Sequence, residues 1–247
     1  MNKFEPVMPG RKLAQPVDVD VARRSGGEVV LPISQNTVLR NTYWLLALSM
    51  LPTIAGAWAG MQFNFIALFR SAPIMTPLLM FAAMLGSLFV VTRLRNSGWG
   101  VVALFGFTFI AGVFLTPILT VAAGVRNGGQ LVALAGGMTA AIFFAMAAIA
   151  TVTKKDFSFM GKFLFVGVIL LIVASLANLF LQIPALSITV SAIAVLIFSA
   201  YILYDVSNIV RGGETNYIMA TLGLFLNVYN IFISLLNILL AFSGNRD

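Results

Sequence analysis

The sequence has 247 residues, of which 60% are hydrophobic and 9% are charged, and its mean hydropathy is +0.99. Soluble domains contain about 25% charged residues, so a chain this apolar needs the bilayer as its solvent. The sequence contains no Cys and no His, which excludes disulfides, thiol nucleophiles, Ser-His dyads and most zinc sites. An intramembrane aspartyl protease needs two membrane aspartates, and the apolar stretches contain one. The sequence therefore predicts a non-enzymatic membrane protein with no cofactor and no metal.

The first 37 residues form a polar segment that contains Pro6, Pro9 and Pro16 and the pair Gly26-Gly27. This segment lacks the apolar core of a signal peptide, so we expect it to remain attached to the mature protein. Its composition is typical of a disordered tail. The predicted domains are therefore a cytoplasmic tail, residues 1–37, and a transmembrane domain, residues 38–247.

Seven apolar stretches are long enough to cross the hydrocarbon core as helices, which takes about 20 residues each. No soluble domain separates them, so the predicted fold is an all-α bundle of seven transmembrane helices. Pro52, Pro77 and Pro117 fall inside the first three stretches, where we expect them to kink the helices. The predicted spans are residues 41–61, 72–91, 98–122, 129–151, 157–181, 185–210 and 217–242.

Lys and Arg are distributed unevenly between alternate connections. With the N-terminus in the cytoplasm, twelve of the fifteen basic residues fall on the cytoplasmic side. This bias predicts a multi-pass membrane protein whose N-terminus is cytoplasmic and whose C-terminus lies on the opposite, periplasmic or extracellular, side. The basic residues flank apolar spans and form no dense patch, so the net charge of +7 does not indicate nucleic-acid binding.

The last two predicted spans carry the most informative polar residues. Asp205 is the one acidic residue well inside an apolar span. Small and polar residues recur on the last span at steps of three and four, which places them on one helical face. A helix surrounded by lipid gains nothing from such a face, so we expect it to point into the bundle, toward Asp205. This polar stripe consists of Ala220, Gly223, Asn227, Asn230, Ser234 and Asn237.

A tight polar turn joins these two spans. Gly212 and Gly213 are expected to end the sixth helix in the left-handed conformation, and Thr215 or Asn216 to cap the seventh. A phosphate-binding loop is not expected at Gly212, Gly213 and Glu214, because no Lys-Ser/Thr pair follows.

Five stretches resemble the Bax inhibitor-1 family of multi-spanning proteins, and within it the bacterial YccA-like branch. The most specific is the RGGETNY turn, which is followed by VYNIF. The resemblance runs from about Val38 to the C-terminus, and it implies a seven-helix bundle whose last helix is enclosed by the other six. The stretches are VLRNTYWLLALS, KKDFSFMGKFL, ANLFLQIPAL, ILYDVSNIVRGGETNYIMAT and NVYNIFISLLNIL.

The resemblance implies two functions. Members of the YccA-like branch bind and modulate FtsH, a membrane-anchored AAA protease, and are slow substrates that it engages through a cytosolic N-terminal tail. Other family members are pH-sensitive calcium leak channels. We expect the first function here, a binding protein that inhibits FtsH, and keep a pH-sensitive cation leak as the alternative. The tail is then either an initiation site for the protease or a segment that serves topology alone.

In the leak channels, two facing aspartates on helices six and seven share a proton, and a basic residue near the end of helix two can pair with them. The first aspartate matches Asp205, the second falls on Asn227, and Arg93 lies near the place of the basic residue. A lone carboxylate cannot form the shared-proton pair. It is also a weak ligand for Ca²⁺, which prefers several carboxylates among six to eight oxygens. The resemblance thus gives three proton-sensing or pore candidates and a weak case for a cation at Asp205.

Two interpretations of Asp205 stay open: a proton-sensitive switch that sets the packing of helices six and seven, or a carboxylate that pairs with Arg93 or a capping group. For Asn230, Ser234 and Asn237, interhelical hydrogen bonds, worth about 0.6 kcal/mol each, are favoured over a water-filled path.

Overall fold

The computed structural model describes residues 32–153 and 155–243, with side chains from residue 37 onward. Seven helical stretches in these residues are long and apolar enough to cross a membrane, and no strand occurs among them. The prediction of an all-α fold with seven spans is therefore confirmed. The helices are α2 (Pro32–Gln62), α3 (Ile66–Ser71), α4 (Met75–Leu94), α5 (Trp99–Phe114), α6 (Thr116–Ala123), α7 (Gly128–Thr153), α8 (Met160–Leu181), α9 (Pro184–Val210) and α10 (Tyr217–Ser243).

The spans lie within a few residues of their predicted positions. Helices α4 and α8 begin at Met75 and Met160, each three residues later than predicted, and the largest shift is at the start of the first span. Helix α2 begins at Pro32 and so includes the end of the segment predicted as a tail. The remainder of that segment, residues 1–31, lies outside the described residues. Helix α3 is an addition to the prediction and lies between the first two spans.

The three prolines have different effects on their helices. The third span is broken beside Pro117: α5 ends at Phe114, and α6 begins at Thr116 with the proline in its first turn. Helix α2 continues through Pro52. Pro77 lies in the first turn of α4, where its missing N–H costs no intrahelical hydrogen bond. Among these three positions, only Pro117 coincides with a break between two helices.

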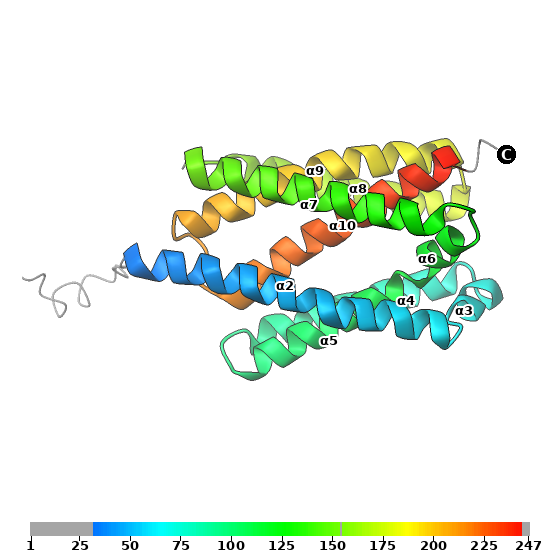
Figure 1. Cartoon of the computed structure of the whole chain (residues 1–247), viewed down its shortest axis with the longest axis horizontal. Helices are drawn as coiled ribbons and strands as arrows, with labels where there is room; N and C mark the ends of the chain where they lie inside the picture. Colours follow the sequence, from blue (N-terminus) through cyan, green and yellow to red (C-terminus); the bar gives the residue numbers. More distant parts are fainter. Residues whose placement is uncertain (1–31, 154, 244–247) are drawn as a thin grey trace, which may run out of the picture. The chain divides into compact units, whose positions relative to one another are not determined.

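Helix α10 runs obliquely between two groups of helices (Figure 1). In one group α2 and α4 pack on α5, and in the other α7 and α8 pack on α9. Helix α10 contacts α2, α5 and α6 on one side and α7 and α9 on the other. Twelve of its residues are buried, more than in any other helix of the described residues. The last helix is thus the centre of the packing, and its enclosure by all six other spans remains a prediction.

Helices α2 and α5 approach so closely that glycine is required at their contact. Gly56 and Gly60 lie four residues apart on α2, and Gly112 faces α2 from α5. A Cβ atom at Gly56 would overlap the carbonyl group of Phe109, and a Cβ atom at Gly112 would overlap the carbonyl group of Thr53. Small residues at this spacing allow membrane helices to pack backbone against backbone. The first span is therefore held directly against the backbone of the third.

The outer surface is rich in large apolar side chains, as a surface in contact with lipid requires. The three tryptophans belong to it: Trp44, Trp58 and Trp99 are 68%, 64% and 70% exposed. Trp58 and Trp99 lie within four residues of an end of their spans, where amphipathic rings are typical of the membrane–water interface, whereas Trp44 lies seven residues inside the first span.

Candidate functional site

Asp205 and Asn227 face each other across the contact between α9 and α10. The Nδ2 atom of Asn227 donates a hydrogen bond to Oδ2 of Asp205 at 2.7 Å, and Asn227 is 5% exposed. Gly223 lies one turn before Asn227 and makes room for the carboxylate, because a Cβ atom there would lie 3.2 Å from Oδ2 of Asp205. The two residues that the resemblance names together are thus in direct contact, and an amide stands opposite the carboxylate.

The C-terminal half of the polar stripe also lies against the bundle. Asn237 donates through Nδ2 to the hydroxyl oxygens of Ser187 and Ser191 on α9, at 2.9 and 2.8 Å. Ser234 is 7% exposed. Asn230 donates to a backbone carbonyl one turn earlier in its own helix. Asn237 therefore makes the interhelical hydrogen bonds that the periodicity predicts, while this bond of Asn230 stays within α10.

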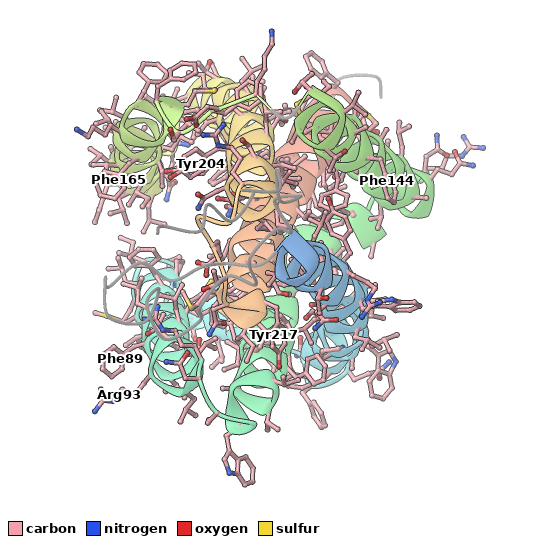
Figure 2. The ribbon with its side chains drawn as sticks, turned by 90° about the vertical axis from the view of Figure 1, so that its left-hand side faces the viewer. Phe89, Arg93, Phe144, Phe165, Tyr204 and Tyr217 are labelled. Atoms are coloured by element: carbon pink, nitrogen blue, oxygen red, sulfur yellow. The ribbon has the colours of Figure 1, made fainter. Side chains whose placement is uncertain are left out.

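Arg93 lies apart from this pair. It is an exposed residue in the last turn of α4, and Figure 2 shows it beside Phe89 at the periphery, directed away from the bundle. On the helix of Asp205 itself, the neighbouring residue Tyr204 packs against Gly161 of α8 and not against Arg93. The geometry brings Asn227 to Asp205, and it does not bring Arg93 there.

The turn between α9 and α10 ends one helix sharply. Gly212 has a φ of 79°, which is the left-handed conformation predicted for it. The backbone N–H of Gly213 donates to the carbonyl of Asn208 at 2.9 Å. A Cβ atom at Gly213 would overlap the side-chain oxygen of Asn208. The first glycine thus supplies the backbone conformation and the second supplies space.

Asn216 caps the helix that follows. Its Oδ1 accepts hydrogen bonds from two backbone N–H groups in the first turn of α10, at 3.0 and 3.1 Å. Glu214 in turn accepts the backbone N–H of Asn216 at 2.7 Å. The Nδ2 atom of Asn216 donates to the carbonyl of Arg95 and to Oδ1 of Asn96, at 3.0 and 2.9 Å. The cap therefore ties this turn to the connection between α4 and α5.

A second tie at the same end of the bundle links this turn to the connection between α7 and α8. Arg211 and Asp156 form an ion pair at 2.9 Å, with side chains 46% and 48% exposed. Ser207 donates its hydroxyl to the carbonyl of Lys155 at 2.9 Å. Hydrogen bonds from Ser158 and, less strongly, the charge of Arg211 hold the pKa of Asp156 below its ordinary value. An ion pair this exposed contributes little stability alone, so we regard the tie as positional.

Two hydroxyl groups that sequence reasoning missed repair the break in the third span. The backbone N–H that would bond the carbonyl of Val113 is absent at Pro117, and Thr116 donates its hydroxyl to that carbonyl at 2.6 Å instead. Tyr229 of α10 donates to the carbonyl of Ala111 at 2.9 Å. The signal available in the sequence was a proline near the middle of a span, because each carbonyl that it frees inside a membrane must find another donor.

The site offers hydrogen bonds and one ionisable group in the membrane. Within the described residues, no group of three or more His, Cys, Asp or Glu is placed to hold a metal ion. Asp205 can exchange a proton, and Asn227 can donate to it in either protonation state. The pair can therefore link α9 and α10 by a hydrogen bond in both protonation states of Asp205.

A packed bundle of seven apolar helices with one amide–carboxylate pair defines a class of polytopic membrane protein. The chain belongs to the family described as Inhibitor of apoptosis-promoting Bax1, which matches residues 35–244. The resemblance to the Bax inhibitor-1 family is therefore confirmed.

Similar proteins occur in several bacteria. An uncharacterized protein of Neisseria meningitidis is 44% identical over 214 residues, which cover 86% of this chain and 94% of the relative. A protein of Escherichia coli K12 named modulator of FtsH protease YccA is 40% identical over 213 residues, 84% of this chain and 91% of the relative. An uncharacterized membrane protein of Vibrio cholerae is 39% identical over 213 residues, 86% of this chain and 93% of the relative.

Proposed function

We propose that this protein binds a membrane-anchored AAA protease of the FtsH type in the bacterial inner membrane and inhibits it, while being degraded slowly itself. The observation that carries the proposal is the 40% identity, over most of both chains, to the Escherichia coli modulator of FtsH protease. The protein acts without catalysis: it occupies the protease and delays the turnover of other membrane substrates.

The packing of α2 supports slow degradation. If the N-terminus is cytoplasmic, a protease that pulls on it must extract α2 first. Helix α2 packs on α5, α9 and α10, and its contact with α5 is made backbone to backbone at Gly56 and Gly112. Forced unfolding is governed by the unfolding rate of the element that resists it. A first span held this tightly slows extraction at its first step.

The polar ties provide further resistance at the same end of the bundle. The Asn216 cap joins the start of α10 to the connection between α4 and α5. The ion pair of Asp156 and Arg211 joins the connection between α7 and α8 to the end of α9. Figure 1 shows the N-terminal end of α2 at this end as well. Pulling on α2 therefore acts on a set of helices that are linked to one another.

The test uses purified FtsH in proteoliposomes with a membrane substrate, in the presence and absence of this protein. We expect slower degradation of the substrate and co-purification of the two proteins. A variant that lacks residues 2–30 should fold, bind less and resist degradation. If the substrate is degraded at the same rate in both samples and the proteins do not associate, the proposal is wrong.

A second candidate is a pH-sensitive cation leak of the Bax inhibitor-1 type. The observation that favours it is a cavity of about 390 Å³ between α4, α8, α9 and α10, which Asn230, Ser234 and Ser191 line. Against it stands the lone carboxylate, because Asp205 shares its site with an amide. Calcium flux into the same vesicles at pH 6 and 8, lost in Asp205→Ala, would favour the leak over the inhibitor.

A further inference from the structure

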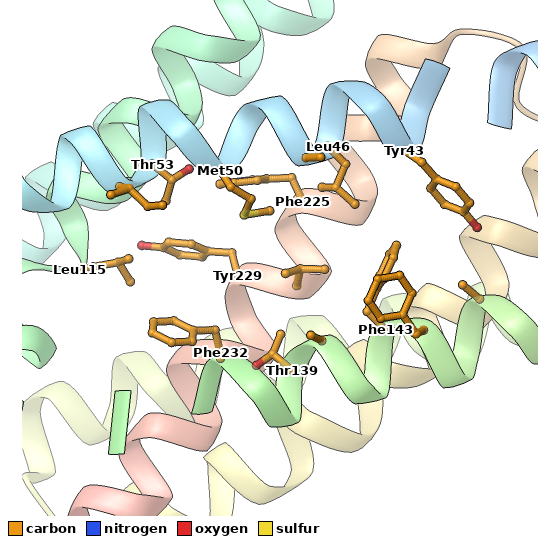
Figure 3. A pocket seen from close by; sticks show the side chains of 17 residues that line it. Tyr43, Leu46, Met50, Thr53, Leu115, Thr139, Phe143, Phe225, Tyr229 and Phe232 are labelled. Carbon is orange, nitrogen blue, oxygen red and sulfur yellow. The ribbon is translucent and has the colours of Figure 1, made fainter. Parts of the chain in front are cut away.

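A cavity of about 610 Å³ lies between α2 and α7, with α10 as its rear wall (Figure 3). The two helices meet at one end of it, where the rings of Tyr43 and Phe143 pack edge to face with centroids 5.9 Å apart. From there α2 lines the cavity as far as Ile54. We call this cavity the α2–α7 groove.

The polar side chains in the walls of the groove present no accessible hydrogen-bonding group to an occupant. Thr53 and Thr139 donate their hydroxyls to carbonyls of their own helices, at 2.8 and 2.7 Å. Tyr229 donates to Ala111. The hydroxyl of Tyr43 has no hydrogen-bond partner among the described residues, but it is buried and therefore out of reach of an occupant. An occupant therefore meets hydrocarbon alone, so it gains by burying apolar surface and loses by bringing a polar group.

The dimensions of the groove match one acyl chain. From Tyr43 to Ile54 the groove is about 16 Å long at 1.5 Å per helical residue, close to half of the roughly 30 Å hydrocarbon core. A cavity of about 150 Å³ holds one benzene ring, so 610 Å³ holds roughly four times as many carbon atoms. A whole transmembrane helix, a cylinder about 11 Å wide and 30 Å long, takes up roughly 2,800 Å³ and is far too large.

The groove is continuous with the surface that faces lipid. Ile54 and Phe144 line it and are also 65% and 68% exposed, and both belong to helices that cross the membrane. We propose that the α2–α7 groove is a binding site for one acyl chain of a membrane phospholipid, which enters sideways from the bilayer and packs against α10. This inference stands independently of any association with a protease.

Two adjacent glycines on α7 provide a matched test. Gly136 lines the groove, Gly137 is exposed outside it, and a Cβ atom at either position meets nothing within 4 Å. Gly136→Trp places an indole in the groove, whereas Gly137→Trp places the same side chain in the lipid. Both substitutions raise helix propensity by the same amount, so a difference in lipid binding between the two variants is due to occupation of the groove by the indole.

The measurement is native mass spectrometry of delipidated protein titrated with palmitoyl-oleoyl phosphatidylethanolamine in dodecyl maltoside. We expect the unmodified protein and Gly137→Trp to retain one lipid per chain, and Gly136→Trp to retain it at least about fivefold less. Equal retention by both variants, or no retained lipid on the unmodified protein, would overturn the proposal. Unchanged lipid retention in Gly136→Trp together with weaker capture of FtsH would also overturn it, in favour of a protein side chain in the groove. Circular dichroism of each variant confirms that the bundle has folded.

Discussion

Replacing Gly112 with Ala tests how the first span is held in the bundle. The new Cβ atom would overlap the carbonyl group of Thr53 and lie 3.0 Å from the backbone nitrogen of Ala57. These atoms belong to the backbone of α2, so no side-chain rotation can make room, and the two helices must separate. The matched control is Gly106→Ala on the same helix, where a Cβ atom meets nothing within 4 Å.

The two substitutions should change stability in opposite directions. Overpacking of a tight contact costs about 1–3 kcal/mol, and exchange of Gly for Ala in a helix returns about 1 kcal/mol. We expect Gly112→Ala to be destabilised by up to about 2 kcal/mol, a factor of up to roughly 30 in the folded-to-unfolded ratio, and to lie toward this upper end because the overlap is with backbone atoms that cannot rotate away. Gly106→Ala gains the propensity term alone and should match or exceed the stability of the unmodified protein.

The first assay is reversible unfolding in mixed micelles of SDS and dodecyl maltoside, followed by circular dichroism, because it requires no partner. The second is the rate at which FtsH degrades each variant in proteoliposomes. We expect Gly112→Ala to unfold at a lower SDS content than the unmodified protein and to be degraded faster. Gly106→Ala should neither lower the SDS content at the midpoint nor raise the degradation rate. Equal unfolding of the two variants would refute the backbone contact between α2 and α5. Unfolding of Gly112→Ala at lower SDS without faster degradation by FtsH would refute extraction of α2 as the slow step.

Three further substitutions test the polar contacts. Asn227→Asp sets two carboxylates where an amide now donates across 2.7 Å, and because both cannot ionise at this distance, SDS unfolding should become easier at pH 8 than at pH 6; a flat profile contradicts this. Asn237→Leu removes two interhelical hydrogen bonds, and at about 0.6 kcal/mol each the midpoint of SDS unfolding should fall measurably, whereas an unchanged midpoint would show that the bonds are replaced. Hydrogen bonds from Ser158, with a smaller contribution from Arg211, lower the pKa of Asp156, so its stabilisation is present above the unfolded pKa and is lost as the pH falls through the folded pKa. Asp156→Asn should therefore unfold at a slightly lower temperature at pH 7 than the unmodified protein, with a gap that closes as the pH falls below the ordinary pKa of Asp, about 3.9; a gap of constant size excludes this carboxylate.

The sequence was sufficient for the span count because membrane spans are defined by length and apolarity, which are local properties. The turn was predictable for a similar reason: Gly212 and Asn216 act through their own backbone and the first turn of the next helix. The contact between Asp205 and Asn227 followed from the resemblance and from the spacing on α10. Each of these features depends on residues close together in the chain or on one helical face.

Contacts between helices far apart in the chain could not be predicted in this way. Gly56 and Gly60 have the spacing of a close-packed membrane interface, but spacing alone does not say that α5 is the partner. The break at Pro117 was expected as a kink, yet the donors that repair it, Thr116 and Tyr229, depend on where α10 passes. The loose match of Arg93 to a basic partner failed to give a contact, because α4 ends with that side chain directed outward (Figure 2).

The amide at Asn227 bears on which of the two proposed functions this bundle suits. Two carboxylates can bridge α9 and α10 only while they share a proton, so their contact opens and closes with pH. An amide N–H donates to a carboxylate oxygen whether or not that group is protonated, so the contact of Asn227 with Asp205 does not require a proton. A bundle held in this way keeps α10 packed on α9 across the range of pH in which a two-carboxylate bundle would loosen. Constant packing is of little use to a gated leak, whereas it is what a protein needs if it is to resist extraction by the protease that it occupies.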